Sequence, residues 1–232
     1  MSKNKSFIIA IIIIASVLIL AGVCYLIFDN SDKINQGNFR ITDMMIQSRV
    51  NVDEVQEDAQ NTKSISDMVL NLTQSNTISI LLTKDVKIKN IYIDEITIKE
   101  PSLKGNVGLY LKNKDEAISF SDNMSRISLP YEEYEGQYLV EIGVNNKEFA
   151  KSVKIPDGTS SVTFDGTILK LLNLNVSDLK FELKFTLNVV DEFGNTTKCK
   201  MTIRAPEEDL STSGIVVIHE DLNDYIFKKG GK

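Results

Sequence analysis

Side chains able to carry out chemistry are few in this sequence, and their spacing matches no catalytic motif. The 232-residue chain has one histidine, His219, and two cysteines, Cys24 and Cys199. A Ser-His-Asp or Cys-His mechanism would have to use His219, yet neither a Gly-x-Ser-x-Gly nor a cysteine signature accompanies it. A zinc site would need several histidine or cysteine ligands. We therefore predict no catalytic residue, no metal site and no cofactor, and we place His219 on the surface.

Acidic side chains are plentiful, but no pair of them is distinguished from the rest. Asp157-Gly158 and Asp165-Gly166 could begin calcium loops, although neither shows the dense alternation of oxygen ligands that a dedicated site uses. Turn formation is the preferred interpretation of both dipeptides. Cys199 is in phase with the apolar residues of its segment, which predicts a buried, unreactive thiol. An enzyme with a carboxylate pair, such as a glycosidase, is the least favoured class of function.

One segment has an unusual composition that suits a binding surface. Residues 131–138 follow Pro130 and contain three of the seven tyrosines of the chain together with three glutamates. Exposed tyrosines often anchor interfaces, because they bring a large contact area at a small cost in side-chain entropy. The alternative is a hairpin tip in which Tyr138 packs inward and the acids solvate the loop. The candidate partner-binding residues are Tyr131, Glu132, Glu133, Tyr134 and Glu135.

The elements that would hold these residues begin with a long apolar segment. Residues 7–28 are 22 consecutive residues, and none of them is charged. As a helix they would extend about 33 Å, enough to cross a hydrocarbon layer of about 30 Å. A cleaved signal peptide has a shorter apolar region before a small-x-small site, whereas this one continues past Ala21 and Gly22. A lipid anchor at Cys24 is a further alternative, but Val23 precedes the cysteine. We predict one uncleaved transmembrane helix.

The charges that flank this segment predict its orientation. Lys3 and Lys5 precede it, and Asp29 and Asp32 follow it. Because positive charge is retained on the cytoplasmic side, residues 1–6 should be cytoplasmic and the remainder extracytoplasmic. The protein should therefore reside in the cell membrane as a single-pass protein.

Charge and cysteine content limit the partners and the compartment of the outer domain. The whole chain has a net charge of −6, and the part beyond the apolar segment is more acidic still, because Lys3 and Lys5 lie before it. Bulk electrostatics therefore argue against nucleic acid and anionic lipid as partners. Cys199 is the only cysteine after the segment, so an internal disulfide is impossible. This is ordinary for a bacterium with a single membrane.

Beyond the apolar segment, the sequence divides into a spacer, a β domain and a tail. Residues 29–63 are mostly polar and predict a partly ordered spacer, although residues 39–50 contain enough apolar side chains for one strand or a short helix. Residues 64–206 show the period of two that is typical of strands. Residues 207–232 predict an acidic C-terminal extension, in which residues 215–218 are strand-like.

The β domain contains many short strands and one short helix. The clearest strand covers residues 179–189 and the return strand residues 198–204, each apolar on one face and polar on the other. Residues 167–174 predict a helix of about two turns. Further strands are predicted at residues 77–83, 86–98, 106–112, 117–121, 138–144, 148–155 and 161–164. The phase of alternation changes near Asn90 and Asp94. This pattern favours a β-sandwich.

The stretch at residues 185–206 resembles the closing strand pair of bacterial immunoglobulin-like surface domains. Those domains often carry an Asp-x-x-Gly-Asn-Thr turn before a last strand of alternating Thr and apolar residues, and Asp191, Gly194, Asn195 and Thr196 occupy matching positions. The chain has no tryptophan and no disulfide pair, so the antibody-type pattern is absent. The resemblance implies an all-β, immunoglobulin-like β-sandwich in an extracellular setting behind the single N-terminal transmembrane helix. It implies no ligand.

Three classes of function follow from these observations. The favoured class is a non-enzymatic, membrane-anchored scaffold or accessory subunit whose outer domain binds other envelope proteins. The alternative is a surface module that binds carbohydrate or a host molecule, although the absence of tryptophan weighs against sugar stacking. An enzyme comes last.

Overall fold

The structure is a computed structural model that describes residues 39–55, 65–84, 86–99, 107–111, 118–119, 126–205 and 210–230. The predicted cytoplasmic residues 1–6 and transmembrane segment 7–28 lie outside these ranges. Within the described part of the chain, no helix has both the length and the apolar character needed to span a membrane.

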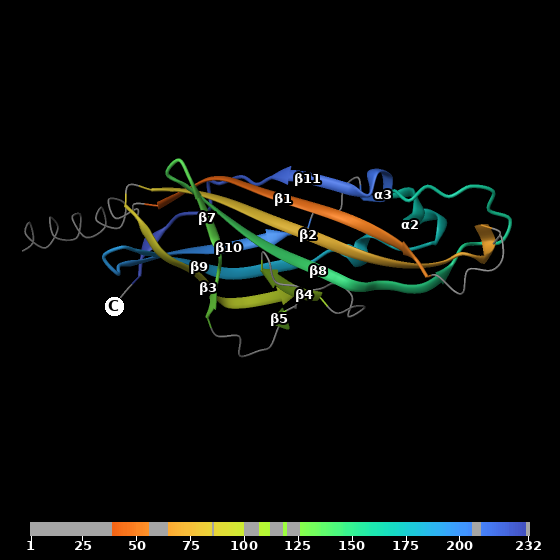
Figure 1. Cartoon of the computed structure of the whole chain (residues 1–232), viewed down its shortest axis with the longest axis horizontal. Coiled ribbons are helices and arrows are strands. Elements are labelled where there is room, and N and C mark those ends of the chain that lie inside the picture. Colours follow the sequence, from red (N-terminus) through yellow and green to blue (C-terminus); the bar gives the residue numbers. More distant parts are fainter. Residues whose placement is uncertain are drawn as a thin grey trace, which may run out of the picture.

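The described residues form two antiparallel sheets with few helices (Figure 1), which confirms the predicted all-β class. The first sheet has the order β11-β1-β2-β8-β4-β5, and β7 also pairs with β8. Its strands are β1 (Phe39–Glu54), β2 (Val69–Lys84), β4 (Val107–Leu111), β5 (Ile118–Ser119), β7 (Tyr131–Tyr134), β8 (Gln137–Lys154) and β11 (Ile215–His219). The second sheet has the order β12-β10-β9-β3-β6. Its strands are β3 (Ile88–Lys99), β6 (Ile127–Ser128), β9 (Glu182–Asp191), β10 (Thr196–Arg204) and β12 (Lys228–Lys229).

The two sheets pack face to face around one large core. Successive strand residues point to opposite faces, so every second side chain turns inward. On β2 these side chains are Ile78, Ile80 and Leu82, and on β9 they include Leu183 and Leu187, all fully buried in the same cluster. The arrangement is that of a β-sandwich.

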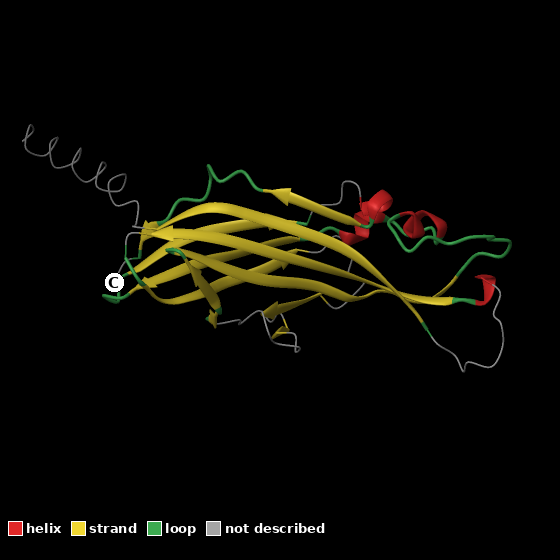
Figure 2. Cartoon of the chain, turned by 45° about the horizontal axis from the view of Figure 1, so that its top comes forward, coloured by secondary structure: helices red, strands yellow, loops and turns green. Residues whose placement is uncertain are grey.

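A second core lies where β1, β2 and β8 extend beyond the other sheet. Short helices cover this part of the first sheet, and Figure 2 shows them gathered at one end of the molecule. The helices are η1 (Ile65–Asp67), α2 (Thr167–Leu171), η2 (Val176–Leu179) and α3 (Leu210–Ser213). Leu70 and Leu72 of β2 pack in this cluster with Ile168 and Leu169 of α2 and with Leu210 of α3.

Buried polar side chains of the first sheet lie between the strand residues of the two cores. Gln74 of β2 donates hydrogen bonds from Nε2 to Ser48 Oγ at 3.4 Å and to the Leu179 carbonyl at 2.9 Å. Asn76 donates from Nδ2 to the Val144 carbonyl at 2.8 Å. Because a buried amide without partners would cost stability, these bonds make the polar residues compatible with the interior and fix η2 to β2.

Of the two alternatives left open for residues 39–50, the strand is confirmed, but β1 is longer than predicted. It is not part of a spacer, because it is an inner strand of the first sheet between β11 and β2. Phe39 and Ile41 face the core, and so do Met44 and Ile46. A register shift between Ile41 and Asp43 moves the inward side chains from odd to even positions. This bulge interrupts the period of two, so the segment did not show the regular alternation that would have predicted a long strand.

The predicted C-terminal extension at residues 207–232 is also wrong in its described part. Strand β11 pairs with β1 of the first sheet, and β12 pairs with β10 of the second. Phe227 is buried against the core, with its ring centroid 6.2 Å from that of Phe39. The segment therefore crosses from one sheet to the other and closes one side of the sandwich.

Other predictions differ from the structure in their boundaries. Residues 138–144 and 148–155 belong to the single strand β8, residues 161–164 are not a strand, and the predicted helix is reduced to α2. The predicted changes of phase near Asn90 and Asp94 are confirmed, because the pairing of β3 with β9 shifts register at both places.

Candidate functional site

The tyrosine-rich segment crosses the opposite side of the sandwich and then forms a hairpin. Strand β6 pairs with β3 of the second sheet, whereas β7 pairs with β8 of the first. Between them, Leu129 is buried and donates its backbone N–H to the Ile91 carbonyl at 2.9 Å. The candidate residues therefore extend from a segment that is fixed to both sheets.

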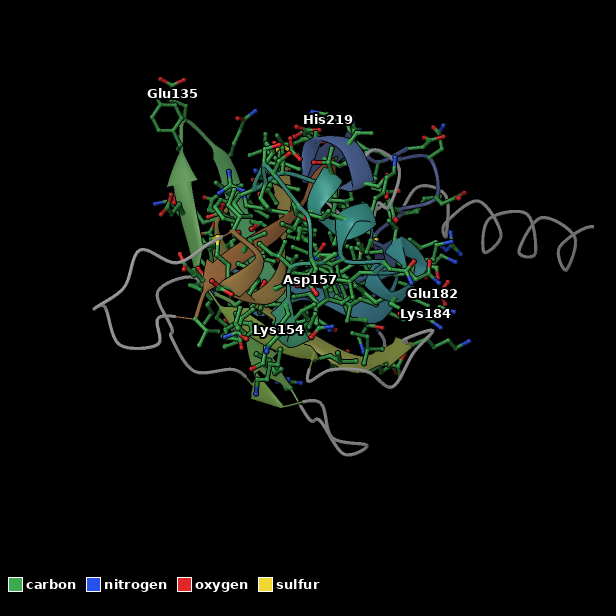
Figure 3. All side chains as sticks on the ribbon, turned by 90° about the vertical axis from the view of Figure 1, so that its right-hand side faces the viewer. Glu135, Lys154, Asp157, Glu182, Lys184 and His219 are labelled. Atoms are coloured by element: carbon green, nitrogen blue, oxygen red, sulfur yellow. The ribbon has the colours of Figure 1, made fainter. Side chains whose placement is uncertain are left out.

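The β7–β8 hairpin has a two-residue loop, Glu135-Gly136, between the paired residues Tyr134 and Gln137. Both loop residues have positive φ, 47° at Glu135 and 80° at Gly136. Positive φ at both positions is what the tight type I′ hairpin loop requires, and glycine adopts it without steric cost. Figure 3 shows Glu135 at the tip of this hairpin, which projects from the body of the sandwich.

The structure separates the three tyrosines of the segment. Tyr138 is buried in the core, and Tyr131 packs beside it with ring centroids 5.6 Å apart. The Tyr131 hydroxyl donates to the Ile88 carbonyl at 3.2 Å. Tyr134 instead leaves 72% of its surface in solvent. Of the predicted tyrosine pair, only Tyr134 can serve as an exposed anchor, and Tyr131 belongs to the margin of the core.

The three candidate carboxylates, Glu132, Glu133 and Glu135, are all exposed around Tyr134. They belong to the same hairpin, so the tip combines one large aromatic ring with a local negative charge. Such a surface complements a basic partner surface, since complementary charge raises association rates and excludes acidic competitors.

Lys84 lies beneath the hairpin, with Nζ 4.2 Å from the centroid of the Tyr138 ring. Its Nζ is enclosed, and no described residue forms a hydrogen bond with it. Burial lowers the pKa of Lys84, and the nearby Glu133 and Glu192 carboxylates act in the opposite direction. Burial also raises the pKa of Tyr138, and hydrogen bonding with Glu133 adds to that rise. The cation–π contact ties the end of β2 to the base of the hairpin.

His219 and Cys199 lie on different strands, one on the surface and the other in the core. His219 Nδ1 of β11 is 2.8 Å from Asp43 Oδ1 of β1, and both side chains are about half exposed or more. Cys199 is 1% exposed in the core, and burial raises the pKa of its thiol to about 12. A thiol with this pKa is protonated at neutral pH, so it is a poor nucleophile. No group of three His, Cys, Asp or Glu side chains in the described part could hold a metal ion.

The two Asp-Gly dipeptides form turns. Gly158 has φ +82°, and Thr159 donates its backbone N–H to the Pro156 carbonyl at 3.3 Å. Asp165 accepts a hydrogen bond from the Thr167 backbone N–H at 2.9 Å, and the hydroxyl of Thr167 also donates to it. These bonds hold the pKa of Asp165 below its usual range, and they lie directly before α2.

The sequence interpretation missed one exposed residue, Phe193, which leaves 75% of its surface in solvent in the β9–β10 turn. Asp191 Oδ1 accepts hydrogen bonds from the backbone N–H groups of Phe193 at 2.9 Å and Asn195 at 2.7 Å. Asn195 Nδ2 also donates to Asp191 Oδ2 at 2.8 Å. The signal was present in the sequence, because Phe193 is the one apolar residue among the polar residues of the predicted turn.

Comparisons with known proteins give no family. No family model matches the chain, and neither a curated protein nor a solved structure matches it.

Proposed function

We propose that this chain is a single-pass, membrane-anchored extracytoplasmic protein, and that its sandwich binds other envelope proteins as a non-enzymatic scaffold or accessory subunit. The anchor would be residues 7–28, whose apolar length suits a bilayer. The binding surface would be the tip of the β7–β8 hairpin. The observation that carries this proposal is Tyr134, which is held 72% exposed on a tight hairpin among three carboxylates.

The construction of the hairpin supports a protein partner. Tyr131 and Tyr138 anchor its base to the core, and the two-residue loop restricts its tip. A backbone that is already ordered loses little entropy on binding, and an exposed aromatic side chain on such a backbone is a favourable interface anchor. The proposal includes the likeness to bacterial immunoglobulin-like surface domains, which the β9–β10 hairpin and its Asp191 turn support.

Co-purification of the full-length chain from carbonate-washed membranes in mild detergent tests this proposal. We expect the uncleaved chain in the washed membranes and a defined set of envelope proteins recovered with it. Replacement of Tyr134 with Ala should weaken their association by about 2 kcal/mol, the range of an interface anchor, and should leave thermal stability unchanged. Phe164→Ala is the matched control, because Phe164 is also exposed, at 56%, and precedes α2 far from the tip.

Three results would contradict the proposal. A shortened, soluble form in the medium would remove the membrane anchor. Equal recovery of partners with Tyr134→Ala and with the unchanged chain would remove the tip as the binding surface. Retention on glycans, without envelope proteins, would favour the surface-module alternative.

A further inference from the structure

Several segments that are distant in the sequence meet at the end of the sandwich where β1 begins. Phe39, the first residue of β1, pairs with Lys84, the last residue of β2. Ile88 at the start of β3 pairs with Asp191 at the end of β9. Strand β12 pairs with the start of β10. Figure 1 shows these strand ends together, opposite the end that carries α2 and α3. We name this the basal end.

Phe193 is held outward at the basal end. Asp191 accepts the backbone N–H of Phe193, and Glu192 next to it donates its backbone N–H to the Lys87 carbonyl at 2.9 Å. The backbone of the turn is thus fixed both internally and to the β2–β3 connection, and in this position the Phe193 side chain is 75% exposed. An exposed phenylalanine ring forgoes the favourable free energy that its burial would provide.

Exposed lysines lie at the same end of the sandwich as this ring. Lys87 precedes β3 and accepts the backbone bond from the turn, and Lys228 and Lys229 lie on β12, which pairs with the start of β10. Glu192 lies in the turn, and Glu133 of the neighbouring hairpin acts on Lys84. The three exposed lysines contrast with the net charge of −6 of the chain. An exposed aromatic ring flanked by lysines is typical of surfaces that rest in a membrane interface.

The length of the chain before β1 limits how far the basal end can lie from a bilayer. Residues 29–38 are the ten residues between the apolar segment and Phe39. Fully extended, ten residues span at most about 36 Å, so β1 must begin within that distance of the end of the anchor. The opposite end of the sandwich lies much farther from the start of β1, because the 18 residues of β8 extend about 60 Å.

We infer that the basal end contacts the membrane, with Phe193 inserted among lipid headgroups and Lys87, Lys228 and Lys229 against anionic phosphate groups. This inference rests on the proposed function, because it requires the anchor at residues 7–28. The contact belongs to the second sheet, whereas the acidic tip belongs to the first. It orients the long strands away from the bilayer and keeps Tyr134 near its surface, since Tyr134 pairs with Gln137, the first residue of β8.

A single tryptophan provides the test, because the chain contains none. Phe193→Trp in the full-length chain, reconstituted in nanodiscs with brominated acyl chains, should show blue-shifted emission and strong quenching. Phe164→Trp is the matched control at the opposite end and should be quenched several-fold less. Quenching of Trp at position 193 should increase when phosphatidylglycerol is added to phosphatidylcholine. It should decrease when Lys228→Glu and Lys229→Glu are introduced, because the acids oppose anionic lipid.

The outcomes separate this inference from the proposed function. If the chain is incorporated in nanodiscs and the two tryptophan variants show the same unquenched emission, the basal end does not touch the membrane, and the anchor stands. If neither variant is incorporated, the anchor itself is wrong and the inference fails with it. If the quenching at position 193 changes neither with anionic lipid nor with the lysine substitutions, the role of the lysines is overturned.

Discussion

At the scale of single residues, the Asp191 carboxylate stabilises the turn between β9 and β10 that holds Phe193. Its two oxygens accept from Phe193, Asn195 and the Asn195 side chain, and Gly194 supplies the positive φ that the turn needs. Burial by itself would raise the pKa of Asp191, but hydrogen bonds from Asn195, Phe193 and Gly194 more than offset it and hold the pKa below its usual range.

Asp191→Ala should lower the free energy of unfolding by at least about 2 kcal/mol at pH 7, because several N–H donors lose a charged acceptor. The pKa of Asp191 is depressed in the folded state, so its contribution is present above the unfolded pKa of about 3.9 and is lost as the pH falls through the folded value. The difference between the two chains in urea unfolding should therefore be largest above about pH 5 and shrink below about pH 4.

Asp157→Ala is the control for this prediction. Asp157 is exposed in another Asp-Gly turn, so its replacement should change stability by no more than about 0.5 kcal/mol. Equal losses of unfolding free energy for the two variants would show that the hydrogen bonds of Asp191 do not stabilise the protein more than an exposed carboxylate does.

At the scale of elements, β1 shows how a long strand can be only partly recognised in a sequence, since residues 39–50 allowed either one strand or a short helix. Its inward positions change from odd to even at the bulge between Ile41 and Asp43. Farther along the strand, the inward residue Ser48 is a buried polar side chain, and the next inward residue, Val50, belongs to the second apolar core. The strand nevertheless pairs with β2 along nearly its whole length. Its place in the sheet is therefore a property of the pairing, which the composition of the segment does not reveal.

A matched pair of neighbouring methionines tests the phase of β1. Met44 is fully buried, and Met45 faces the other side of the sheet and is partly exposed. Met44→Asp should cost several kcal/mol, because it places a carboxylate among apolar groups, and should abolish the cooperative thermal transition. Met45→Asp should keep the fold. If both variants melt like the unchanged chain, residues 39–54 belong to a spacer outside the sandwich.

At the scale of the whole molecule, two connecting segments close the sides of the sandwich. Residues 127–134 cross from the second sheet to the first on one side, and residues 215–229 cross from the first to the second on the other. The Tyr225 hydroxyl donates a hydrogen bond to the Thr202 carbonyl of β10 at 2.8 Å. Burial raises the pKa of Tyr225 to about 12. Closure protects strand edges that could otherwise pair with other chains.

Replacement of Phe227 tests this closure. Phe227→Ala should lower the free energy of unfolding by about 3–5 kcal/mol, because a buried ring against Phe39 is lost and a cavity remains. Ile226→Ala, at a neighbouring residue that is 48% exposed, should cost far less. Chemical denaturation measures both. If both changes are silent, the segment is a tail that is not part of the sandwich.

The sequence by itself determined the class of the fold, the β9–β10 hairpin and its turn, the phase changes near Asn90 and Asp94, and the buried state of Cys199. These are consequences of local alternation, which each strand carries whatever its partners are. The sequence also singled out the segment that contains the candidate surface.

Only the tertiary structure decided which tyrosines of that segment are exposed to solvent. Tyr131 and Tyr134 are equivalent in composition, yet pairing with β8 turns one ring onto Tyr138 and leaves the other in solvent. The same holds for the basal end, where Phe193 and Lys228 come to one end of the second sheet because β10 pairs with both β9 and β12. The physical reason is that contacts between distant residues depend on register and strand order, which no local pattern specifies.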